Sequence, residues 1–213
     1  MGRLVACVVS LVLLAGCPPT ITKVNRVPST EAVPAPVSID RSGPVRHEAS
    51  GLAFAEGYGD FRRVSAYRYD AAGLDTSVGY DARSPGCRVV TTFYVYPTPR
   101  MTSIGASPDV VASTEQQWLE REYAGVKAVI GSVRGVTGGG IENPVTTPAA
   151  GAPLHGRSLR FFMTGDLTSE LRLFVYDHQW FLKYRFTYPT ACEAEAQRRI
   201  GGLLRALPWA VAG

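Results

Sequence analysis

Recognisable catalytic and metal-binding patterns are absent from this sequence. It contains no His-Glu-x-x-His, no Gly-x-Ser-x-Gly and no Ser-x-x-Lys motif. Its three histidines, His47, His155 and His178, are far apart and stand at no metal-ligand spacing from a carboxylate or a cysteine. We therefore predict no metal, no cofactor and no enzymatic activity. A hydrolase whose catalytic groups are distant in sequence remains an alternative.

Lysine is also scarce. The chain has 22 basic residues, of which only Lys23, Lys127 and Lys183 are lysines, and its net charge is +4. The arginines are scattered and form no cluster, which argues against a nucleic-acid partner. A triple glycine at 138–140 is followed by no Lys-Ser or Lys-Thr pair, so it does not predict a phosphate-binding loop.

No apolar run is long enough for a transmembrane helix. The most apolar stretch, Leu4–Leu14, has eleven residues. As a helix it would reach roughly 17 Å, against about 30 Å for a hydrocarbon core. Arg3 precedes this run, and Ala15-Gly16 follows it directly before Cys17. The arrangement is typical of an export signal, which we place at residues 1–16.

The segment Leu14-Ala15-Gly16-Cys17 resembles the lipobox of bacterial lipoproteins. The resemblance implies cleavage before Cys17, a lipid on its thiol and an acyl group such as palmitate on the new amino terminus. Several acyl chains, at roughly 0.8 kcal/mol per buried CH₂, hold a protein durably at a membrane of the cell envelope. In this family an Asp after the cysteine can mark inner-membrane retention. Pro18 therefore favours the outer membrane, with the domain facing the periplasm.

Two cysteines remain once Cys7 leaves with the signal and Cys17 carries lipid. Cys87 and Cys192 would face an oxidising compartment, where two thiols suggest one disulfide closing a loop of about 105 residues. Cys192 also continues an apolar helical stripe with Ala196 and Ile200. Two buried, unreactive thiols are therefore the alternative.

The mature chain divides into a tether and one domain. Residues 17–50 are rich in Pro, Ser and Thr and lack hydrophobic periodicity, which predicts a flexible tether. Residues 51–213 contain the periodic segments, and we expect them to form a single globular domain. An apolar content of 46% is sufficient for a core of that size.

Strands and helices follow from periodicity and from helix-end residues. Ser107-Pro108 begins a helix that runs to about Ile130. Thr190-x-x-Glu193 predicts a capping box for a second helix, with an apolar stripe that includes Leu203 and Leu207. The Gly- and Pro-rich segment 135–153 predicts a long loop. We expect strands at 64–69, 74–80, 88–96, 159–164, 171–176 and 181–188.

These elements predict an α+β fold: a mainly antiparallel sheet covered by two helices, similar to an α/β/α sandwich. Their order loosely resembles the PsbP/DcrB-like fold, which includes envelope lipoproteins. The resemblance rests on the aromatic strand Thr92–Pro97, the helix after it, and the ending Trp180–Phe186 with its helix. It implies a role in binding or assistance and brings no catalytic residues.

The expected hairpin pairs Tyr176 with Phe181, which places Arg172 opposite Arg185 on one face of the sheet. With Arg160 and Lys183 this face is a candidate surface for an anionic headgroup or an acidic partner. The alternative is a solvated sheet face, or a surface that packs under a helix.

Aromatic residues could line a pocket for an apolar or sugar ligand, although packing within the sheet is the commoner role. We expect an envelope lipoprotein without catalytic activity that binds or assists an envelope protein. A carrier of a small apolar or anionic ligand, held between sheet and helix, is the alternative. The candidate pocket residues are Tyr94, Tyr96, Tyr176, Trp180, Tyr184 and Tyr188.

Overall fold

The structure, a computed structural model, describes residues 35–39, 42–99, 107–147 and 153–207. All of them belong to one compact unit that spans residues 34–213. The predicted signal peptide, Cys17 and the predicted tether up to residue 34 lie outside the described residues. Within the described residues, no helix is both long and apolar enough to cross a membrane.

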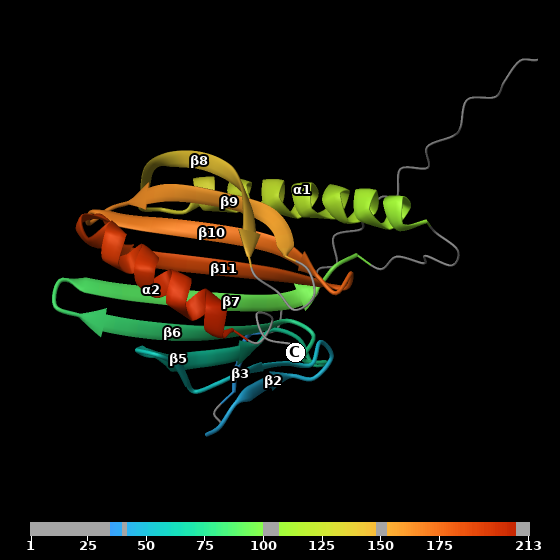
Figure 1. Ribbon diagram of the computed structural model, residues 1–213, viewed down its shortest axis with the longest axis horizontal. Helices are drawn as coiled ribbons and strands as arrows, with labels where there is room; N and C mark the ends of the chain where they lie inside the picture. The colour runs from blue at the N-terminus through green and yellow to red at the C-terminus, as the bar shows by residue number, and fades with distance from the viewer. Residues whose placement is uncertain (1–34, 40–41, 100–106, 148–152, 208–213) are drawn as a thin grey trace, which may run out of the picture. The chain divides into compact units, whose positions relative to one another are not determined.

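Among the described residues, nine strands form one antiparallel sheet (Figure 1). Eight of them lie in the order β1-β5-β6-β7-β11-β10-β9-β8, and β4 pairs with the start of β5. Two further strands, β2 and β3, form a separate hairpin. The bounds are β1 Val37–Ser38, β2 Val45–His47, β3 Leu52–Phe54, β4 Gly57–Tyr58, β5 Phe61–Arg68, β6 Thr76–Ser84, β7 Cys87–Pro97, β8 Val136–Thr147, β9 Leu154–Met163, β10 Leu167–Tyr176 and β11 Trp180–Pro189.

The two described α-helices pack on opposite faces of the sheet. α2 (Glu193–Ala206) follows a single 3-10 turn, Thr190–Cys192, and lies across β7 and β11. α1 (Pro108–Ser132) lies against β8, β9 and β10. In Figure 1, α2 lies in front of the sheet, so the α1 side faces away from the viewer. This arrangement confirms the predicted α+β fold with a helix on each face of an antiparallel sheet.

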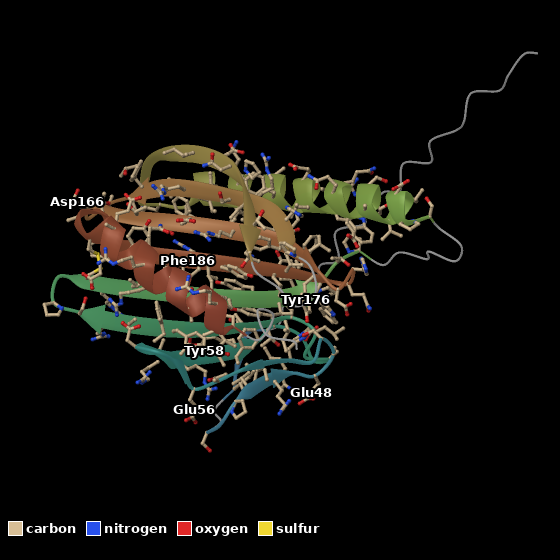
Figure 2. The ribbon with its side chains drawn as sticks, viewed as in Figure 1. Glu48, Glu56, Tyr58, Asp166, Tyr176 and Phe186 are labelled. Atoms are coloured by element: carbon tan, nitrogen blue, oxygen red, sulfur yellow. A yellow bond between two sulfur atoms is a disulfide. The ribbon has the colours of Figure 1, made fainter. Side chains whose placement is uncertain are left out.

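The α2 side holds the larger core. In β7 the odd-numbered residues from Val89 to Val95 are buried, as the period of two requires for a strand with one covered face. Phe93 packs edge to face against Tyr184 and Phe186 in this cluster. Phe186, labelled in Figure 2, is buried together with the inward residues of α2 and with the β2–β3 hairpin.

The α1 side holds a smaller core. Trp118, Leu119 and Tyr123 of α1 pack on apolar side chains of β9, β10 and β11, among them Leu173 and Phe181. The hydroxyl of Ser107 accepts a hydrogen bond from the backbone N–H of Val110. Ser107 is thus the N-cap of α1, and the helix start predicted at Ser107-Pro108 is confirmed.

The folded domain begins earlier than the predicted boundary at Gly51. Val45 and His47 are each 1% exposed, and the His47 ring hydrogen-bonds Ser50 and the backbone oxygen of Leu74. Strand β1 (Val37–Ser38) also pairs with β5, and the backbone N–H of Ile39 donates to the backbone oxygen of Ala66. The prediction of a tether up to residue 50 is therefore wrong for residues 37–39 and 42–50. The prediction missed β2 and β3 because a strand of three residues is too short to show the alternation of apolar and polar residues that identifies a strand.

Two further local predictions are wrong. Segment 136–147 is not a loop: it forms the edge strand β8, with irregular register between Val136 and Gly138 and between Gly139 and Ile141. Glycine and proline are tolerated there because one side of an edge strand has no ladder partner to satisfy. The capping box does not form, since the Thr190 hydroxyl hydrogen-bonds Thr168 instead.

A disulfide joins Cys87, at the start of β7, to Cys192, directly before α2. The two Cα atoms lie 5.7 Å apart and the residues are separated by 105 positions. The link fastens the first turn of α2 to the centre of the sheet. Of the two alternatives left open by the sequence, the disulfide is confirmed.

Candidate functional site

The hairpin that carries the predicted basic face has a different register. β10 and β11 pair Tyr176 with Trp180, one residue away from the predicted partner Phe181. The loop of Asp177, His178 and Gln179 is one residue shorter than expected, and the first two have positive φ angles of 48° and 58°. Figure 2 labels Asp166, in the turn just before β10, and Tyr176, the last residue of β10.

This shift separates the four predicted basic residues. Arg172 now faces Tyr184, whereas Arg185 faces Leu171. Residues that pair directly point to the same side of a sheet, and consecutive residues point to opposite sides. Arg160 and Arg172 therefore lie on the α2 side, and Lys183 and Arg185 lie on the α1 side. The predicted single face of Arg160, Arg172, Lys183 and Arg185 is wrong.

On the α2 side, the two arginines surround Glu170. Arg172 Nη2 lies 2.6 Å from Oε1 of Glu170, and Arg160 Nη2 lies 3.8 Å from its Oε2. Arg160 also pairs with Glu193 of α2, and Gln197 of α2 donates to Glu170 Oε2 at 2.9 Å. These partners join the sheet to α2, so this cluster serves structure.

On the α1 side, Lys183 lies between two tyrosine rings. Its Nζ is 4.6 Å from the ring centre of Tyr94 and 5.0 Å from that of Tyr96. The register explains this, because Lys183 pairs directly with Tyr94 and Tyr96 is the next residue along β7 on the same face. Arg185 is further along, over the ring of Phe161 at 5.7 Å.

A hollow of about 390 Å³ opens beside Lys183. The residues that line this hollow come from four parts of the chain on the α1 side of the sheet. Two lie on β7, one on β11 and one on α1. The other two lie in the β5–β6 connection, one directly after β5 and one directly before β6. All six lining residues carry a polar group. They are Tyr69, Asp75, Tyr94, Tyr96, Glu122 and Lys183.

Burial perturbs four of these groups, and one of them is Tyr94, whose pKa it raises. The Tyr96 hydroxyl donates to Glu122 Oε1 at 2.7 Å, and burial together with the Glu122 charge raises the pKa of Tyr96. Burial also raises the pKa of Asp75, with repulsion from Asp70 adding to the effect. Burial lowers the pKa of Lys183, against the attraction of Glu122 and Asp75. The site thus holds charged groups with reduced hydration.

A second hollow, of about 650 Å³, lies where the β2 strand and its turn meet β1 and the β5–β6 turn. Arg46, Glu48 and Arg68 are among its lining residues. It adjoins positions 40 and 41, which fall outside the described residues. We therefore take the hollow beside Lys183 as the candidate site.

Most of the other residues predicted for a site lie outside this hollow. Of the aromatic candidates, only Tyr94 and Tyr96 line the site. Tyr184, Tyr188 and Trp180 are buried in the α2-side core, and Tyr176 packs against it. His178 hydrogen-bonds Glu115 at the hairpin tip. Within the parts of the chain that the structure describes, no group of three or more His, Cys, Asp or Glu side chains could hold a metal ion.

Sequence reasoning missed Tyr69, Asp75 and Glu122. Tyr69 and Asp75 end the two strands of one hairpin, a place where polar residues are common and carry little signal. Glu122 was detectable, since it follows Leu119 by three positions and so adjoins the apolar stripe of its helix. The chain matches no protein-family model and none of the curated proteins.

Proposed function

We propose that this protein is a lipoprotein of the bacterial cell envelope, anchored through Cys17, whose domain acts as a binding or accessory module without catalytic activity. The motif Leu14-Ala15-Gly16-Cys17 is the basis for the anchor. The disulfide between Cys87 and Cys192 is the observation that carries the location, because such bonds persist in oxidising compartments. Pro18 after the cysteine favours the outer membrane, facing the periplasm.

A binding role rests on two further observations. The order of elements resembles the PsbP/DcrB-like fold, whose members mostly bind or assist. The hollow beside Lys183 brings six polar side chains together from β7, β11, α1 and the β5–β6 hairpin. A partner protein of the envelope is the expected interaction for a module held at the membrane.

The anchor is tested by Cys17→Ser in the full chain, produced in a bacterium that processes lipoproteins. The unchanged chain should partition into the detergent phase, and its mass should exceed that of residues 17–213 by the lipid and acyl groups. The variant should keep residues 1–16 and carry no lipid. Cys7→Ser is the matched control, because it removes a cysteine from the signal and should be processed normally. Identical processing and mass for Cys17→Ser would disprove the anchor.

A second candidate function is carriage of a small ligand between sheet and helix. It is favoured by the volume of the hollow, about 390 Å³, which exceeds the roughly 300 Å³ at which ligand pockets begin. The polar lining speaks for a polar ligand.

A further inference from the structure

The ammonium group of Lys183 has hydrogen-bond donors that no described residue uses. This group has three N–H donors, and its neighbours within the described residues are the faces of Tyr94 and Tyr96. No described carboxylate lies within ion-pair distance of Nζ, although Asp75 and Glu122 line the same hollow. A partly buried ammonium in this position favours a ligand that supplies hydrogen-bond acceptors.

The carboxylates require the opposite from a ligand. Glu122 accepts one hydrogen bond, from Tyr96, and a carboxylate has further acceptor positions. The Asp75 carboxylate accepts no hydrogen bond from a described side chain. Both groups favour a ligand that supplies donors close to its acceptors.

The presence of both positive and negative groups around the hollow restricts the charge of the ligand further. One ammonium and two carboxylates lie around the same space. An anionic ligand would meet Asp75 and Glu122, and a cationic ligand would meet Lys183, so either one introduces a like-charge contact. A neutral molecule avoids both.

Hydroxyl groups satisfy these conditions together, since each hydroxyl both donates and accepts. A sugar ring carries several neighbouring hydroxyls and also has C–H faces that pack on aromatic rings. Tyr69, Tyr94 and Tyr96 supply such rings around the polar groups. We propose that the hollow binds a neutral saccharide, with Lys183 donating to its hydroxyl oxygens and Asp75 and Glu122 accepting from its hydroxyls. This inference rests on the carrier role proposed above and specifies its ligand.

The test is a titration of the full lipidated chain in a detergent without a sugar headgroup. The probes are glucose, galactose, mannose and N-acetylglucosamine, with glucuronate and glucosamine as charged counterparts. Binding is read from the ring resonances of ¹³C-labelled tyrosines, with those of Tyr94 and Tyr96 assigned through their Phe variants. At least one neutral sugar should shift both resonances with a Kd of about 1 mM or below, and the charged counterparts should bind more weakly.

Two matched pairs of variants localise the binding. Lys183→Met should weaken the affinity at least about tenfold, because a charged donor is lost. Lys127→Met removes the α1 lysine that pairs with Glu142, and it should leave binding unchanged. Tyr94→Leu should also weaken binding, whereas Tyr67→Leu, on the same face at 38% exposure but outside the hollow, should not.

Three results would overturn the proposal: no neutral sugar shifts these resonances with a Kd of about 1 mM or below, a charged counterpart binds more tightly, or Lys183→Met binds as well as the unchanged chain. None of them touches the acylation of Cys17, which is measured by mass. If the anchor fails instead, the Cys17→Ser chain should still bind the sugar with the same affinity.

Discussion

The carboxylate of Glu170 lies 2.6 Å from Nη2 of Arg172, two positions along the same strand, and its side chain is 8% exposed. Consecutive same-face positions on β10 thus hold opposite charges beneath α2. The second carboxylate oxygen faces Arg160 and Gln197. One buried acid therefore pairs with two arginines, of which Arg160 is shared with Glu193, and accepts a hydrogen bond from Gln197 of the helix.

Glu170→Gln should destabilise the domain by about 2 kcal/mol. Removing one member of a buried ion pair costs roughly 3–5 kcal/mol, and the partial exposure of Arg160 reduces that value. Urea unfolding at pH 7 measures the change. The control is Glu193→Gln, which removes the exposed partner of Arg160 and should cost less than about 1 kcal/mol. Equal losses would contradict a structural role for Glu170.

The same cluster shows where sequence reasoning fails. The β-branched and aromatic residues of segment 171–188 are sufficient to predict two strands there. The register of these strands depends on the length of the loop between them. The predicted pairing of Tyr176 with Phe181 places apolar residues on one face of the hairpin and charged residues on the other. The structure instead buries Glu170 and Arg172 as a pair, and a one-residue shift then moves Arg185 to the other face. A buried ion pair has no periodic signature.

The disulfide should contribute much of the stability of the domain. Closing a loop of 105 residues is worth about 4–5 kcal/mol in the chain-entropy model. Cys87→Ser and Cys192→Ser should each lower the free energy of unfolding by about 4 kcal/mol, measured by urea titration. Reductant should lower the unchanged chain to the same level and leave both variants unaffected. A reductant-insensitive unchanged chain would mean that the bond does not form.

Asp75→Asn should stabilise the domain at neutral pH. Burial raises the pKa of Asp75 in the folded state above its unfolded value of about 3.9. The folded state then holds this proton more tightly, so ionisation of Asp75 costs stability as the pH rises past that value. Unfolding free energies at pH 7 and pH 3.5 measure the effect. The variant should be more stable at pH 7, and the difference should disappear at pH 3.5; a gain of equal size at both values would exclude ionisation as its cause.

The candidate site was only partly within reach of the sequence. Lys183 is recognisable in the sequence as a charged residue between the apolar Leu182 and the aromatic Tyr184. Tyr94 and Tyr96 are recognisable because they belong to a strand rich in aromatic residues. Their meeting depends on the adjacency of β7 and β11, which are more than 80 residues apart in the chain. Glu122 joins them only because α1 lies on this face of the sheet. Such proximity requires the tertiary structure.

Gly156→Ala tests the pairing of β9 with β10. A Cβ at Gly156 would lie 2.1 Å from the backbone oxygen of Leu173 and 2.5 Å from Cδ1 of Phe174, so the two strands would have to move apart. Overpacking of this kind costs about 1–3 kcal/mol, and the contact with a backbone atom favours the upper end. Gly138→Ala in β8 is the matched control, because its Cβ would have no neighbour within 4 Å. The control should stay within about 0.5 kcal/mol of the unchanged chain in urea unfolding. Equal stabilities of the two variants would show that Gly156 does not face Phe174, and the register of β9 on β10 would then be wrong.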